Sequence, residues 1–132
     1  MIVTGDIENI LIQDLKPLGI PIFKKDAIPE GKVTEERIVV ITSSLKDGTY
    51  WEKGFVNVNF CVPDIKMSNI CVADKSRLLE LERIAKSIES LSTHDGTTYM
   101  YSVYEIGQEK DTELECHFVN ARILFEVLNV IN

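Results

Sequence analysis

The longest strand-like pattern in the sequence is an alternation of apolar and mixed side chains over residues 113–129, close to the C-terminus. In an extended chain every second residue shares a face, and one face here is wholly apolar: Val119, Ala121, Ile123, Phe125 and Val127. The opposite face is mixed: Phe118, Asn120, Arg122, Leu124 and Glu126. A strand with one buried face and one partly solvent-exposed face is typical of an antiparallel sheet, so we expect an interior strand of a sheet here.

Four further segments have strand composition: 20–23, 37–42, 50–62 and 97–106. Pro21 cannot donate a ladder hydrogen bond, so we expect the first of these strands at a sheet edge. The second, RIVVIT, is apolar throughout, which indicates contacts on both faces. We expect it to pair with the third as an antiparallel hairpin, and we expect a polar loop at 107–112 before the closing strand.

Two segments have the period of a helix, 4–15 and 75–91, and each carries its apolar residues on one stripe. Residues 65–74 are expected to be a short connection. The predicted order is α-β-β-β-α-β-β in one domain spanning residues 1–132. Because both helices are apolar on a single stripe, we predict an α+β fold: a single antiparallel sheet of four to five strands with two helices on one face.

Composition narrows the possible functions. The chain has 132 residues, 27% of them charged, and a net charge of −7, which argues against a protein that grips the phosphate backbone of DNA. We therefore expect no direct sequence-specific nucleic-acid contact. No apolar run approaches the ~20 residues that span a bilayer, and the N-terminus lacks the pattern of a signal peptide. We expect no membrane association, and reduced cysteines in an intracellular setting.

The residues that could carry chemistry are few. Cys116 and His117 are neighbours in a strand, so their side chains point to opposite faces and cannot easily share a metal ion. His94 lies in a turn and His117 in a strand, and no nucleophile, phosphate-loop or dinucleotide motif accompanies them. We predict no catalytic, cofactor-binding or metal site and no cofactor. A small enzyme built around His94 and His117 is the least favoured alternative.

Aromatic residues offer a different kind of site. Tyr99 and Tyr101 share a strand face, and without interleaved Lys or Arg they indicate packed sheet surface more than a nucleic-acid stacking platform. Trp51 follows Tyr50 just after a turn at the start of a long strand. Two interpretations remain open for Trp51: a partly buried anchor, or a hot spot in a protein interface.

The order of elements resembles that of the tail-terminator and tail-completion (head–tail joining) proteins of long-tailed bacteriophages and prophages. The likeness covers residues 4–129: a short helix, the IPIF strand, RIVVIT, a long strand with an aromatic near its start (YWEKGFVNVNFCV), one amphipathic helix and a closing hairpin. It implies a structural protein without enzymatic activity that caps the tail tube as a ring, commonly a hexamer. Its partners would be tail tube and neck proteins and further copies of itself. It would reside in the bacterial cytoplasm during virion assembly and then in the virion tail, at the terminator or neck-stopper position.

A closed ring needs two different patches on each subunit. We expect Phe55, Asn57, Phe118 and Leu124 to supply one patch, and Trp51 with Tyr50 and the preceding turn to supply the other. An acidic lumen would repel DNA and let it pass without sticking. The alternative to a ring protein is a non-catalytic bacterial binding module that recognises a ligand with an exposed sheet face.

Overall fold

The computed structural model describes residues 4–43, 51–92 and 98–128, and only the backbone of Trp51. Within these ranges it has two α-helices, α1 (Thr4–Leu15) and α2 (Lys75–Lys86). Its strands are β1 (Ile22–Lys24), β2 (Arg37–Thr42), β3 (Trp51–Pro63), β4 (Ile65–Met67), β5 (Ile70–Val72), β6 (Tyr99–Asp111) and β7 (Cys116–Leu128). The described ranges also contain three short 3-10 helices, which come directly after α1, directly after β1 and shortly after α2: η1 (Lys16–Leu18), η2 (Lys25–Ala27) and η3 (Ile88–Leu91).

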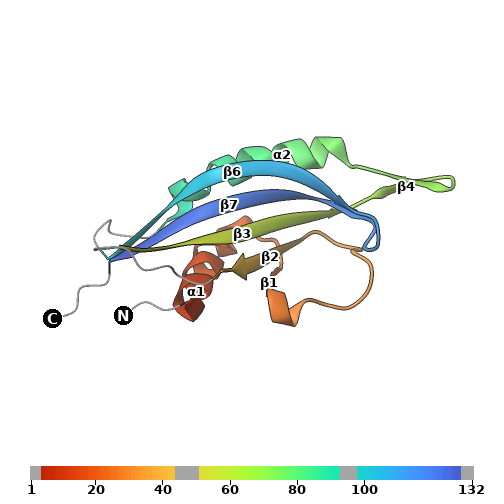
Figure 1. Cartoon of the computed structure of the whole chain (residues 1–132). Coiled ribbons are helices and arrows are strands. Elements are labelled where there is room, and N and C mark those ends of the chain that lie inside the picture. The colour runs from red at the N-terminus through yellow and green to blue at the C-terminus, as the bar shows by residue number, and fades with distance from the viewer. Residues whose placement is uncertain (1–3, 44–50, 93–97, 129–132) are drawn as a thin grey trace.

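Five strands form one sheet in the order β1-β2-β3-β7-β6 (Figure 1). The prediction of an α+β fold is confirmed, and so are the antiparallel β2–β3 hairpin and the interior position of β7. The prediction of a purely antiparallel sheet is wrong, because β1 pairs with β2 in parallel. The twelve residues between these two strands, 25–36, are long enough to carry the chain back to the end of the sheet at which β1 began.

The predicted element order is also incomplete. Residues 65–74, expected to be a connection, contain the antiparallel hairpin β4–β5, which forms a separate two-stranded sheet. This hairpin extends past the end of β3, away from the main sheet (Figure 1). Ser68, at the turn, has a left-handed backbone with φ of 57°.

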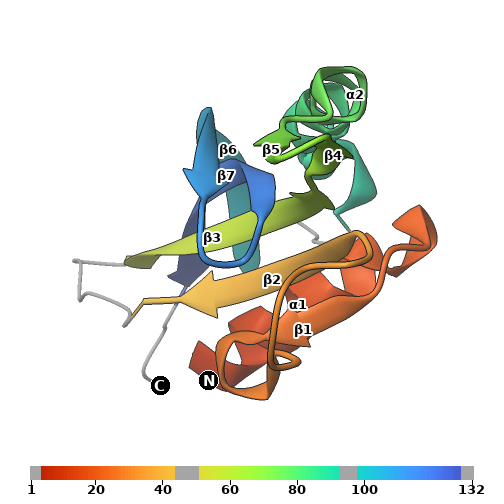
Figure 2. The ribbon, with the colours of Figure 1, turned by 90° about the vertical axis from the view of Figure 1, so that its right-hand side faces the viewer.

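Both helices cover the same face of the sheet, as the single stripes predicted (Figure 2). The apolar faces of β3 and β7 are buried beneath them, and α1 and α2 complete the same core. The fully buried large side chains of this core include Leu11, Leu81, Phe60, Ile123 and Phe125. Burial therefore follows the alternation of β7 seen in the sequence.

Some element boundaries differ from the predicted ones. The helix expected over 75–91 ends at Lys86 and continues as η3, because the hydroxyls of Ser87 and Ser90 donate to the carbonyls of Ile84 and Ser87. Strand β6 runs through the expected loop as far as Asp111, whose side chain accepts a hydrogen bond from the Leu114 amide at 3.0 Å.

Among the described residues, the other face of the sheet, which we call the outer face, has a second layer of packing at one end only. There the segment 25–36 lays Val33 over Val39, Cys61 and Cys116, which form a second buried cluster. The Val33 amide donates to the Leu114 carbonyl at 2.9 Å. This packing explains why RIVVIT is apolar on both sides: its alternate residues enter the two cores.

A buried polar contact joins the N-terminal helix to the last hairpin. The Tyr101 hydroxyl of β6 donates to Asp14 Oδ2 of α1 at 2.8 Å, and the two residues are 4% and 3% exposed. Because this bond spans 87 residues of sequence, it fixes α1 against the far edge of the sheet.

Candidate interaction surfaces

The uncovered part of the outer face carries an aromatic–arginine cluster made of Phe55, Tyr104 and Arg122. The Arg122 guanidinium carbon lies 3.9 Å from the centre of the Phe55 ring and 5.9 Å from that of Tyr104. The two rings are 5.1 Å apart between centroids and tilted by 58°. Tyr104 is 60% exposed and sits at an irregularity in the pairing of β6 with β7. Cation–π packing of this kind holds a flat, partly exposed surface in place.

Beside this cluster runs a ladder of side-chain amides. Asn120 of β7 donates to Asn59 at 2.7 Å and to Asn57 at 3.2 Å, both on β3. The Arg122 Nε atom is buried with no hydrogen-bond acceptor. The outer face thus combines aromatic, cationic and amide groups, a composition found at protein interfaces more than in solvated sheets.

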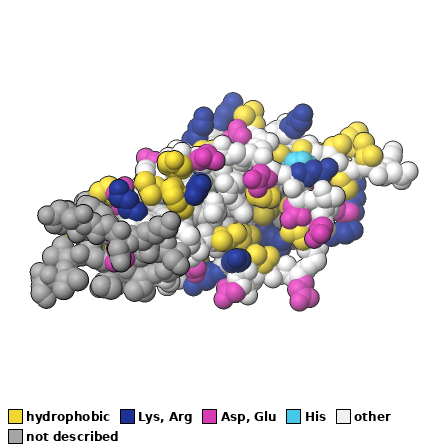
Figure 3. All heavy atoms as spheres, viewed as in Figure 1, with side chains coloured by type: hydrophobic (Ala, Val, Ile, Leu, Met, Phe, Trp, Pro, Cys, Tyr) yellow, Lys and Arg dark blue, Asp and Glu magenta, His cyan; other side chains and the backbone are white. Residues whose placement is uncertain are grey.

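The β4–β5 hairpin is the second exposed apolar feature. Three of its side chains are large, apolar and exposed: Ile65 (45%), Met67 (58%) and Ile70 (62%). In the space-filling view, hydrophobic side chains gather on this projection (Figure 3). Two-stranded hairpins are only marginally stable on their own, so this one needs support at its base or from a neighbour.

The base of the hairpin is held by polar contacts. His117 Nδ1 of β7 lies 2.6 Å from Oδ1 of Asp64, which joins β3 to β4 and has a side chain only 1% exposed. Glu115 binds Lys66 of β4 at 3.3 Å and Lys32 at 3.0 Å. These two lysines lower the pKa of the Glu115 carboxyl. The hairpin is therefore anchored where it leaves the sheet, while large apolar side chains of its two strands remain exposed.

The structure places the expected interface residues as follows. Phe55, Asn57 and Leu124 lie together on the outer face, where Phe55 pairs directly with Leu124 and Asn57 with Arg122. Phe118 is on the same face but packs against the second buried cluster. Tyr50 lies outside the described residues, as does the side chain of Trp51.

The residues considered for chemistry are not brought together into a described cluster. His94 lies outside the described residues, and the ring of His117 is engaged with Asp64. Within the described ranges there is no group of three or more His, Cys, Asp or Glu residues that could hold a metal ion. None of the described helices has the length and apolarity needed to cross a bilayer.

Sequence reasoning missed the hairpin and the partners of Phe55. The sequence does contain the pattern of a β-hairpin here, since IKM and ICV are short apolar runs separated by two turn residues, Ser68 and Asn69. Tyr104 and Arg122 had a weaker signal: their meeting with Phe55 depends on the order of strands in the sheet, which local patterns do not specify.

Comparison with known proteins supports the fold alone. The sequence matches no protein-family model. No match was found among curated proteins either. Among the solved structures that match, one with 14% sequence identity has a TM-score of 0.54 and covers 96% of this chain and 96% of its own. Its name describes no activity, so this likeness shows a shared fold and nothing of function.

Proposed function

We propose that this protein is a structural component of a long-tailed phage or prophage particle: a tail-terminator or tail-completion protein that caps the tail tube and joins it to the head–neck region as a ring. The order of elements supports this proposal, as does a five-stranded sheet that carries both helices on one face and, among the described residues, the exposed Tyr104 ring on the other. In this role the protein has no catalytic activity and binds copies of itself together with tail tube and neck proteins.

The observation that carries the proposal is the projecting hairpin. Its three exposed apolar side chains lie beyond the end of the sheet, whereas the aromatic–arginine cluster lies on the outer face. A subunit with two different, complementary interaction surfaces associates head to tail. Such contacts close into a ring when the rotation that relates neighbouring subunits brings the last subunit back to the first. We therefore assign the hairpin of one copy and the outer face of the next as the two sides of the subunit contact.

Substitution of the hairpin tests this assignment. Each apolar side chain buried in a contact contributes about 1.5–3 kcal/mol, so a Met67→Ser/Ile70→Ser double variant should weaken self-association by at least about a hundredfold. Sedimentation velocity over a wide concentration range measures the effect. Leu79→Ser is the matched control, because Leu79 is also exposed (46%) but lies on α2.

Both variants should retain the unfolding temperature of the wild type, since substitutions of exposed side chains usually change stability by less than ~0.5 kcal/mol. A wild type that stays monomeric at every concentration would contradict the proposal. If the double variant and the wild type self-associate equally well, the assignment of the hairpin to the subunit contact is wrong.

The outer face supports a second candidate function, a non-catalytic bacterial binding module. The half-exposed cluster of Phe55, Tyr104 and Arg122 favours it, because aromatic and arginine side chains are frequent hot spots of protein interfaces. A Tyr104→Ser variant separates the two functions. Loss of self-association assigns the face to ring assembly, whereas unchanged self-association leaves it to a different protein.

A further inference from the structure

The segment 25–36 encloses a buried cation, Arg37, the first residue of β2. Arg37 is only 7% exposed, yet no carboxylate among the described residues forms an ion pair with it. Its Nη1 atom donates to the Pro29 carbonyl at 3.5 Å, the outer limit of a hydrogen bond, and its Nε atom is buried without an acceptor. Arginine keeps its charge in proteins, so a buried guanidinium normally finds a counter-charge.

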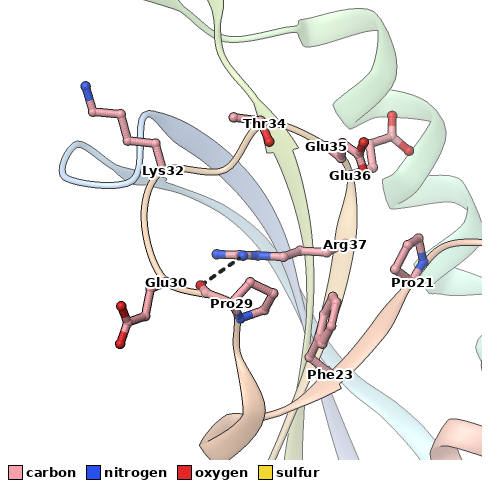
Figure 4. Close-up of a pocket in the computed structure, with 9 residues that line it drawn as sticks. All are labelled: Pro21, Phe23, Pro29, Glu30, Lys32, Thr34, Glu35, Glu36 and Arg37. Carbon is pink, nitrogen blue, oxygen red and sulfur yellow. Dashed lines mark hydrogen bonds between the residues drawn. The ribbon is translucent and has the colours of Figure 1, made fainter.

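Arg37 lines a cavity of about 190 Å³. Figure 4 shows its side chain lying beneath the segment 25–36, with its tip toward Pro29. The walls near it are apolar and come from Pro21, Phe23 and Pro29, and Thr34 adds a hydroxyl. The cavity therefore presents a guanidinium beside apolar rings, and further charged side chains line it as well.

Three of the other charged groups that line this cavity are directed elsewhere. Glu36 faces α2, where Arg77 binds both of its oxygens at 2.7 and 2.8 Å, and Lys32 binds Glu115 at 3.0 Å. Glu30 and Lys32 point outward in Figure 4. Arg37 is thus the cation of this cavity that lacks a partner of opposite charge among the described residues.

The neighbour of Arg37 across the strands is the Cys61 thiol. The pKa of Cys61 is lowered, first because Cys116 hydrogen-bonds to it and then because the Arg37 charge lies nearby and the Arg37 guanidinium hydrogen-bonds to the Cys61 sulfur. A thiol is a weak acceptor and does not replace a carboxylate. The Arg37 guanidinium therefore keeps unused donors.

We propose that this cavity binds a carboxylate attached to a small apolar body, either a small organic acid or the C-terminal residue of a peptide chain. The guanidinium fork matches the two oxygens of a carboxylate, and the rings of Phe23, Pro21 and Pro29 suit an apolar body. A carboxylate is favoured over a phosphate because the acidic residues Glu30 and Glu35 also line the cavity, and their charges repel a doubly charged anion more strongly than a singly charged one. This inference does not depend on ring assembly.

The test is an amide chemical-shift titration of the wild-type protein with isovalerate, N-acetyl-leucine and N-acetyl-leucine amide. Saturable shifts at Phe23, Thr34 and Arg37 are expected with the two acids and not with the amide, which lacks the carboxylate. Tighter binding of isovalerate identifies a free organic acid as the ligand, and tighter binding of N-acetyl-leucine identifies a chain end. Equal shifts with the amide, or no saturable shift with any probe, would overturn the proposal.

Substitution then identifies the residue responsible. Arg37→Gln should weaken acid binding at least about tenfold, whereas Arg83→Gln, the same change at an exposed position of α2 outside the cavity, should leave it unchanged. Should Arg37→Gln fail to fold, inorganic phosphate titrated into the wild type decides instead. Weaker binding of phosphate than of isovalerate supports a carboxylate site, and tighter binding contradicts it. Unchanged affinity in a folded Arg37→Gln variant would also contradict it.

Discussion

The hydrogen bond between Tyr101 and Asp14 gives the sharpest test of how the domain is held together. A Tyr101→Phe substitution removes one hydroxyl and leaves the ring, which stacks on Phe125 with centroids 5.4 Å apart. The volume of the core is thus conserved, and the change removes the hydroxyl's bond of 2.8 Å to the Asp14 carboxylate together with its hydrogen bond to Ser92.

The expected loss follows from burial. Both residues are less than 5% exposed, and a hydrogen bond to a charged group contributes about 1.5–3 kcal/mol. Domains of this size have a total stability of roughly 5–15 kcal/mol. At roughly 3–5 °C per kcal/mol, the unfolding temperature should fall by about 5–15 °C. Denaturant and thermal unfolding followed by circular dichroism measure both quantities.

The pH dependence provides a second readout. Burial raises the pKa of the Tyr101 hydroxyl, and the hydrogen bond to Asp14 raises it further. When the pKa of a group is higher in the folded protein than in the unfolded chain, its stabilising effect is complete at pH values below the unfolded-state pKa, which is about 10 for tyrosine. That stabilisation is lost as the pH rises through the folded-state pKa. The wild type should therefore lose its advantage over Tyr101→Phe progressively above pH ~10.

Tyr104→Phe is the matched control, because it makes the same chemical change on the same strand at a side chain that is 60% exposed. Its stability should stay within ~0.5 kcal/mol of the wild type. Equal stabilities of Tyr101→Phe and the wild type would refute the argument that this bond fixes α1 to β6.

Two further predictions concern the core and the charge. Leu81→Asp should unfold the domain, because Leu81 is 1% exposed on the core side of α2. Leu79→Asp, on the exposed side of the same helix, should unfold at nearly the wild-type temperature. Retained thermal stability of Leu81→Asp would refute the assignment of Leu81 to the apolar stripe of this helix. The protein should not be retained on duplex DNA at ~0.15 M salt, because 21 acidic side chains outnumber 14 basic ones. Measurable retention in a gel-shift assay would contradict an acidic lumen that lets DNA pass.

Local patterns in the sequence predicted the elements that border the main core. The alternation of β7 and the single stripe of α2 reflect burial on one side, and residues such as Ala121, Ile123 and Leu81 are buried as expected. Tyr101 also faces the core with Tyr99, as their shared face predicted. These predictions succeeded because a two- or 3.6-residue period arises directly from contact with one core.

The features missed depend on contacts that have no local period. The parallel pairing of β1 is determined by the path of residues 25–36, a mostly polar segment in which Val33 closes a second core. The β4–β5 hairpin has strands of three residues, too short to establish an alternation. The sequence pattern predicts Arg37 only as the first residue of a strand. Its burial away from any carboxylate partner depends on segment 25–36, which folds over it.

We propose that this domain presents the projecting hairpin and the outer sheet face to copies of itself. Electron microscopy of the concentrated protein tests this proposal. Closed rings are expected, in which Ile65, Met67 and Ile70 of one subunit are buried against Phe55 and Tyr104 of the next. Single subunits only, or rings whose hairpins point into solvent, would contradict it.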